Sequence, residues 1–126
     1  MQIITTDKAP EAIGPYSQAV EAGDFLFCSG QIGIDPAKKM FAGDSVEAQT
    51  WQVFRNIREV LRATALDFAD VVKTTVFLSN MEDFPIVNTI YEREFAGHKP
   101  ARSTVQVAHL PLDALIEIEC IAALKK

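Results

Sequence analysis

The spacing of apolar residues changes several times along the chain, and each change predicts a different element. Alternating apolar and polar residues, or short β-branched runs, are typical of strands. Segments with this pattern are residues 2–6, 17–22, 25–32, 70–79, 102–110 and 114–124. Only Gly23 and Asp24 separate the second of these segments from the third, which predicts a type II′ hairpin turn.

Two other segments have the three-to-four-residue apolar spacing of an amphipathic helix. These are residues 46–65, with a stripe of Trp51, Phe54, Ile57, Leu61 and Ala65, and residues 83–95, with a stripe of Phe84, Val87, Ile90 and Phe95. Asp44 is expected to cap the first helix, and Gly97 to end the second. Residues 35–43 are polar and are expected to form a loop.

The resulting order of elements is β-β-β-α-β-α-β-β. This order predicts an α+β fold in which two helices cover one face of a mixed β-sheet. A chain of 126 residues can bury a core of its own, and its length matches one domain. We therefore expect residues 1–126 to form a single domain.

Alternation along a strand also predicts which side chains face the helices. The last strand has a wholly apolar side, formed by Ile116, Ile118, Cys120, Ala122 and Leu124, so Glu117 and Glu119 are expected on the opposite side. In residues 102–108, Val105 and Val107 are expected in the core. Arg102, Thr104 and Gln106 would then face away from the helices, beside Glu117.

The third strand completes this prediction. Its core side would be Leu26, Cys28 and Ile32, and its outer side Phe25, Phe27, Ser29 and Gln31. Large apolar groups on an open sheet face indicate that another copy of the chain covers it. A charge buried in such an interface needs a partner, so Arg102 and Glu117 either form an ion pair or bind a ligand.

Composition excludes several classes of partner. The net charge of −5 and pI near 4.9 disfavour binding to nucleic acid and to anionic membranes, and no apolar run has transmembrane or signal-peptide length. Cys28 and Cys120 lack metal-ligand spacing and are expected to be buried free thiols of a cytoplasmic protein. His98 and His109 have no ligand companions, so no metal site is expected.

Five stretches resemble the Rid family of the RidA/YjgF type. They are "AIGPYSQAV", "FCSGQIGIDP", "VFLSNMEDFPIVNTIY", "PARSTVQVAHLP" and "IEIECIA", which occur in this order over nearly the whole chain. The resemblance implies a chorismate-mutase-like fold, a homotrimer with active sites between subunits, and no cofactor. The implied activity is hydrolysis of reactive 2-imino and enamine acids, namely 2-iminobutanoate and 2-iminopropanoate, to 2-oxo acids and ammonia.

The resemblance also implies roles for individual residues. Arg102 is similar to the family arginine that binds the substrate carboxylate, and Glu117 resembles the acid that holds the attacking water. Asn88 is similar to an asparagine of the second helix that lies near the cleft. These residue types suit the reaction, because an arginine fork binds a carboxylate with two hydrogen bonds and a carboxylate can deprotonate water.

Four further positions match the family's binding residues. Tyr16 resembles a tyrosine that lines the pocket, while Ser29 and Gly30 match a "SGQ" motif whose glycine carbonyl faces the ligand. Thr104 stands where many relatives have cysteine, at a position that contributes mainly its backbone N–H. This difference removes any thiol chemistry at that position.

Two alternatives to a deaminase stay open. The same fold could form a non-catalytic protein that binds small carboxylates or acts as a regulator, and Arg102 would bind the carboxylate in that case too. Family members with ribonuclease or translation-inhibitor roles are the other alternative, which the acidic composition disfavours.

Overall fold

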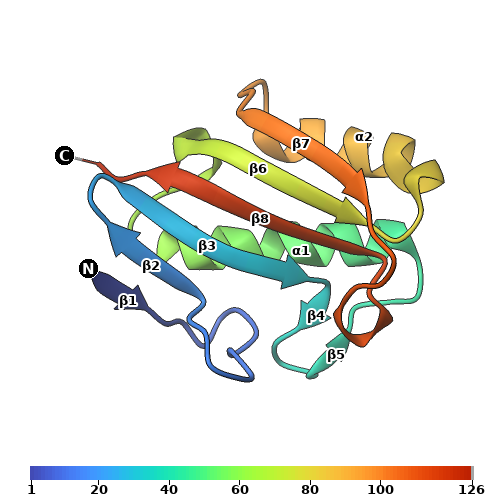
Figure 1. Cartoon of the computed structure of the whole chain (residues 1–126), viewed down its shortest axis with the longest axis horizontal. Coiled ribbons are helices and arrows are strands. Elements are labelled where there is room, and N and C mark those ends of the chain that lie inside the picture. The colour runs from blue at the N-terminus through green and yellow to red at the C-terminus, as the bar shows by residue number, and fades with distance from the viewer. Residues whose placement is uncertain (126) are drawn as a thin grey trace.

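Six strands form one mixed sheet in the computed structural model, which describes residues 1–125 (Figure 1). Lys126, which the expected domain includes, lies outside the described residues. The order across the sheet is β1-β2-β3-β8-β6-β7, with β1 Gln2–Ile4, β2 Ala19–Ala22, β3 Phe25–Ile32, β6 Val71–Leu78, β7 Ala101–Gln106 and β8 Ile116–Ala123. Neighbouring strands are antiparallel except β6 and β7, which are parallel.

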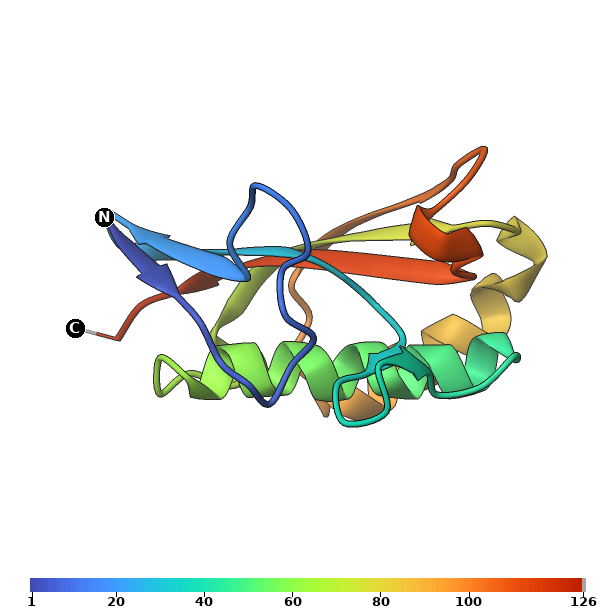
Figure 2. The same cartoon turned by 90° about the horizontal axis from the view of Figure 1, so that it is seen from below.

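Both helices lie on the same face of this sheet and leave the other face open (Figure 2). They are α1 (Val46–Arg62) and α2 (Phe84–Phe95), so the predicted α+β arrangement is confirmed. The cap of α1 is Ser45 and not Asp44. Ser45 directly precedes the first helical residue, and its hydroxyl accepts a hydrogen bond from the Ala48 N–H.

The expected loop at residues 35–43 contains a short hairpin. Its strands are β4 (Ile34–Asp35) and β5 (Met40–Phe41), and Lys39 adopts a left-handed conformation where the chain turns back. The Asp35 carboxylate accepts a hydrogen bond from the Ala37 N–H, which stabilises the turn. Strands of two residues carry too little periodicity to be recognised in a polar sequence.

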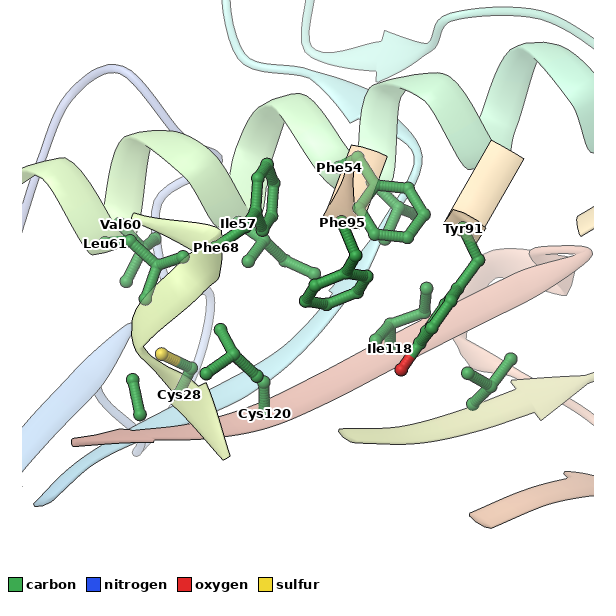
Figure 3. Packing of buried hydrophobic residues seen from close by; sticks show 14 of the residues in the cluster. Cys28, Phe54, Ile57, Val60, Leu61, Phe68, Tyr91, Phe95, Ile118 and Cys120 are labelled. Carbon is green, nitrogen blue, oxygen red and sulfur yellow. The ribbon is translucent and has the colours of Figure 1, made fainter. Parts of the chain in front are cut away.

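The core lies between the sheet and the two helices (Figure 3). Phe54 of α1 is fully buried at its centre, with the rings of Phe68, Tyr91 and Phe95 edge-on at 5.8 to 6.0 Å. Cys28 and Cys120 are opposite one another on β3 and β8 and are buried free thiols, as predicted. A hydrogen bond with Cys28, together with burial, raises the pKa of the Cys120 thiol, so it stays neutral in the core.

Strand β7 faces the opposite way from the prediction. Its parallel register pairs Arg102, Thr104 and Gln106 with Thr74, Val76 and Leu78, all of which are buried under the helices. Arg102, Thr104 and Gln106 therefore lie on the helix side, while Val105 is on the outer side and 41% exposed. Alternation separates the two sides of this strand, but the side that carries Val105 is the one away from the helices.

Strand β3 changes phase partway along its length. Leu26 and Cys28 face the core and Phe25 and Phe27 face outward, as predicted. A β-bulge between Cys28 and Gln31 then reverses the alternation, so that Gln31 is buried opposite Ile118 and Ile32 lies opposite Glu117. The predicted placement of Ile32 inside and Gln31 outside is therefore wrong.

Candidate functional site

The candidate site residues form two separate clusters in the chain. We call them the arginine half-site (Arg102, Asn88, Tyr91 and Phe84) and the glutamate half-site (Glu117, Gly30, Tyr16 and Ser29). The arginine half-site lies at the β7 edge of the sheet beside α2. The glutamate half-site lies where β3 and β8 pair, close to the segment that precedes β2.

Helix α2 forms one wall of the arginine half-site. Phe84, Asn88 and Tyr91 follow one another at intervals of four and three residues, so they share one face of the helix. The Arg102 Nη1 donates a hydrogen bond of 2.8 Å to the Asn88 Oδ1. The Arg102 Cζ lies 4.7 Å from the centre of the Tyr91 ring and 5.2 Å from that of Phe84.

The remaining guanidinium donors of Arg102 face an open cleft. The side chain is exposed, and Asn88, Tyr91 and Arg102 line a cleft of about 920 Å³. Arginine presents five N–H donors in a planar fork, and only one of them is used by Asn88. The arrangement can therefore bind a carboxylate that enters this cleft.

Glu117 is the acid of the glutamate half-site. It lies on the outer side of β8, opposite Phe77 of β6. Burial, and then the nearby charge of Glu119, raise the pKa of Glu117. A carboxyl group with a raised pKa is suited to accept and return a proton near neutral pH.

Gly30 leaves the space that Glu117 occupies. A Cβ atom built on Gly30 would lie 2.8 Å from the Cδ of Glu117 and 3.0 Å from its Cγ. Any residue other than glycine would therefore displace the carboxyl group. The one hint of this contact in the sequence is a glycine within a strand, which often marks a bulge or a close approach.

Ser29 and Tyr16 belong to the part of the site next to β2. The Ser29 Oγ donates a hydrogen bond of 2.5 Å to the Ser17 carbonyl, so the hydroxyl fixes the loop that carries Tyr16. Tyr16 is 54% exposed and, with Gly30, Ile13 and Leu112, lines a cleft of about 590 Å³. Figure 2 shows the segments before β2 and after β7 rising above the open face of the sheet.

Gln18 is a supporting residue that sequence reasoning missed. Its side chain is buried, accepts a hydrogen bond from the Thr6 N–H at 2.7 Å and donates to the Pro10 carbonyl at 2.8 Å. These bonds hold the chain on either side of the loop that carries Tyr16. A buried glutamine has no sequence signature, because glutamine is usually exposed.

Thr104 lies on the helix side of β7, between Arg102 and Gln106. Its Oγ1 is buried and has no hydrogen-bond partner among residues 1–125. Its register partner, Val76, is buried and offers no polar group from its side chain. The hydroxyl is thus a polar atom that the described chain does not satisfy.

Arg102 and Glu117 do not come together within one chain. Arg102 extends toward α2, whereas Glu117 points to the opposite side of the sheet. Across residues 1–125, no ion pair joins them; the pairs that form include Arg58 with Glu94 at 3.0 Å. The prediction that Arg102 and Glu117 share a face is therefore wrong, and so is an ion pair between them within the chain.

The described part of the chain has no cluster suited to a metal ion and no helix suited to span a membrane. Residues 1–125 contain no group of three His, Cys, Asp or Glu side chains that could hold a metal ion. The His98 Nε2 lies 2.6 Å from the Val71 carbonyl. None of the helices described is both long and apolar enough to cross a membrane.

Comparison with known proteins gives the family. The family model described as Endoribonuclease L-PSP matches residues 6–124. The chain is 51% identical over 123 residues to Reactive Intermediate Deaminase A of Arabidopsis thaliana, which covers 98% of this chain and 66% of that protein. It is 47% identical over 121 residues to the mouse 2-iminobutanoate/2-iminopropanoate deaminase, covering 96% of this chain and 90% of that protein.

Solved structures agree with this result. RidA from an Antarctic Psychrobacter superposes with a TM-score of 0.94 at 41% identity, covering 98% of this chain and all of that one. Escherichia coli TdcF with bound serine also has a TM-score of 0.94, at 39% identity and with 99% and 100% coverage. The chain belongs to the Rid family, and relatives named as deaminases support an enzymatic activity in this family.

Proposed function

We propose that this protein hydrolyses reactive 2-imino and enamine acids to 2-oxo acids and ammonia, without a cofactor. The observation that carries the proposal is the Arg102 guanidinium, fixed by Asn88 and two rings at the mouth of an open cleft. The names of the Arabidopsis and mouse relatives support the same reaction. The substrates proposed are 2-iminobutanoate and 2-iminopropanoate.

Arg102 would hold the carboxylate of the substrate. A 2-imino acid carries this carboxylate on the carbon of its electrophilic C=N bond, so fixing one group also places the other. Arginine binds a carboxylate with two parallel hydrogen bonds, which lysine cannot do. The Thr104 backbone N–H and the polar side chain of Asn88 would complete the substrate-binding surface on this side.

Glu117 would activate the water that attacks the imine carbon. As the water oxygen bonds to that carbon, its proton passes to the Glu117 carboxylate and the C=N π electrons move to nitrogen. The carboxyl group returns this proton to the nitrogen, which gives a carbinolamine. Glu117 then accepts the proton of the new hydroxyl group and donates it to the amino group, so the C=O bond forms as the C–N bond breaks and ammonia leaves. A general base of this kind contributes about 100- to 10,000-fold.

The proposed site needs two copies of the chain, because Arg102 and Glu117 lie on opposite sides of one sheet. The open face carries exposed Phe25 and Phe27 from β3 and Val105 from β7, which a neighbouring subunit would cover. We propose a homotrimer in which the arginine half-site of one subunit meets the glutamate half-site of its neighbour. Tyr16, Ser29 and Gly30 would then line the neighbour's side.

The proposed activity can be tested by coupling the protein to a threonine dehydratase and following the disappearance of the imine. The protein should shorten the lifetime of the imine relative to buffer, and Arg102→Ala should abolish this effect. Glu117→Gln should still bind 2-oxobutanoate but lose turnover. A wild-type protein no faster than buffer, with 2-oxobutanoate still bound, would instead support a non-catalytic carboxylate-binding protein.

A mixing experiment tests the shared site. Arg102→Ala and Glu117→Gln subunits, each inactive alone, are unfolded together in equal amounts and refolded. If each site takes Arg102 and Glu117 from neighbouring subunits, about one quarter of the sites regain both residues. Recovery of about a quarter of wild-type activity is expected, whereas no recovery would place both residues of a site in one chain.

A further inference from the structure

The Arg102 side chain lies against two aromatic rings of α2 that we call the aromatic slot, Phe84 and Tyr91. The guanidinium carbon is 4.7 Å from the centre of Tyr91 and 5.2 Å from that of Phe84. A cation over the face of an aromatic ring is attracted by the ring's quadrupole. The slot therefore restricts a long side chain that is otherwise exposed at the edge of the sheet.

A hydrogen bond at its hydroxyl holds the Tyr91 ring in place. Its hydroxyl lies 2.8 Å from the Thr74 Oγ1, and both residues are buried. Thr74 is also the register partner of Arg102 across β6 and β7. Thr74 therefore contacts Tyr91 by a hydrogen bond, Tyr91 contacts Arg102 through its ring, and Arg102 lies beside Thr74 on the paired strand.

The ring also packs against the core. Phe54 and Phe95 lie 5.9 and 4.6 Å from Tyr91, measured between ring centres (Figure 3). Tyr91 therefore cannot rotate without disturbing the core. Burial raises the pKa of the Tyr91 phenol, so the hydroxyl stays neutral and keeps its hydrogen bond to Thr74.

We infer that Tyr91 is a positioning residue for the substrate carboxylate. Its ring, anchored by Thr74, directs the free donors of Arg102 into the cleft and so sets the affinity for the carboxylate. This role rests on the proposed function, because it acts through Arg102. The carboxylate is bound equally in the ground state and in the transition state, so loss of the slot should raise KM and leave kcat nearly unchanged.

The test compares three variants with one control. Tyr91→Leu removes the ring and should raise both the KM for 2-iminobutanoate and the inhibition constant of 2-oxobutanoate about 10-fold, with kcat within about twofold. Tyr91→Phe keeps the ring and should recover most of this loss. Thr74→Val removes only the anchoring hydroxyl and should raise both constants about threefold.

The control is Phe68→Leu, which removes a ring of the same core that packs against Phe54 and Phe95 and not against Tyr91. It should lower stability and leave KM unchanged. The inference is overturned if Tyr91→Leu lowers kcat with KM unchanged, or if Phe68→Leu raises KM as much as Tyr91→Leu does. If Tyr91→Leu does not fold, an unchanged KM in Thr74→Val overturns it equally well.

The same experiment separates this inference from the proposed function. Full turnover by Arg102→Ala would remove the proposed role of Arg102 altogether. An inactive Arg102→Ala, together with an unchanged KM in Tyr91→Leu, would leave the proposed function intact and remove only the positioning role.

Discussion

Replacing Gly30 with alanine should lower turnover strongly while leaving carboxylate binding nearly intact. Gly30 faces the Glu117 side chain, and the added Cβ would lie 2.8 Å from the Cδ of that residue. Among the glycines, only Gly14, Gly23 and Gly97 have positive φ, so alanine would not strain the backbone at Gly30. The effect of the substitution is therefore steric and falls on Glu117.

The size of the effect follows from this geometry. Ordinary van der Waals contacts of a Cβ begin at 3.4 Å, and the atom closest to the added Cβ is the Glu117 Oε2, so this oxygen must move by about 1 Å. A displacement of that size in a reacting group costs about 100-fold in rate. The free energy of unfolding should change little, because the atoms that must move are the end of a flexible, half-buried side chain.

The assay is imine decay in the dehydratase-coupled reaction, with 2-oxobutanoate binding measured by calorimetry. We expect kcat to fall about 100-fold and the dissociation constant to change less than about threefold. Gly43→Ala is the matched control, because its Cβ would lie 2.8 Å from that of Ala48, far from Glu117 in the sequence and in another element. It should lower stability and leave kcat unchanged.

A double-mutant cycle gives the result that would refute this reasoning. In a Glu117→Gln background the base is already lost, so adding Gly30→Ala should cost little more. If Gly30→Ala lowers residual turnover by the same factor in both backgrounds, the displacement of Glu117 is not the cause.

Four other predictions concern pH and stability. Because the pKa of Glu117 is raised above 4.5, kcat/KM should fall as pH decreases through that raised value, and Glu117→Gln should remove this acid limb. Because folding raises the pKa of Glu117, the free energy of unfolding of the wild type should decline as pH rises through the raised value. Chemical denaturation at several pH values would measure this decline, which should be absent in Glu117→Gln. Ala96 ends α2 in the left-handed conformation at φ 50°, which is strained for alanine and not for glycine. Ala96→Gly should therefore stabilise the protein by about 1 kcal/mol, and a destabilised variant would contradict this explanation. Ser45→Ala should cost about 1 kcal/mol and Asp44→Ala much less, as thermal unfolding can measure; equal losses would contradict the assignment of the cap.

Element order and fold class could be predicted from the sequence because they depend on local periodicity. The stripe of α1 and the apolar side of β8 each follow from residues close together in the chain. The short β4–β5 hairpin was missed because its strands contain only two residues each. The shift from Asp44 to Ser45 at the helix cap is an error of one residue, which hydrogen bonding decides.

The arrangement of the site could not be predicted in the same way. Both sides of β7 carry residues that could be buried, so its periodicity is compatible with either orientation of Arg102. The bulge in β3 depends on the pairing with β8, a strand from the far end of the chain. The contacts of Arg102 with Asn88 and of Glu117 with Gly30 are tertiary, and only family resemblance indicated that these residues belong together.

The parallel pairing of β6 and β7 has a consequence for how the two half-sites can vary. Thr74, Tyr91 and Arg102 all lie within the single β6–α2–β7 crossover, the continuous segment Val71–Gln106. Glu117 and Gly30, in contrast, meet only when the two ends of the chain are joined through β3 and β8. A substitution that changes which carboxylic acids bind can therefore be confined to the crossover. A substitution that changes how the proposed base Glu117 acts can be confined to β3 and β8. An assembly of two diverged copies could in this way divide recognition and catalysis between different chains.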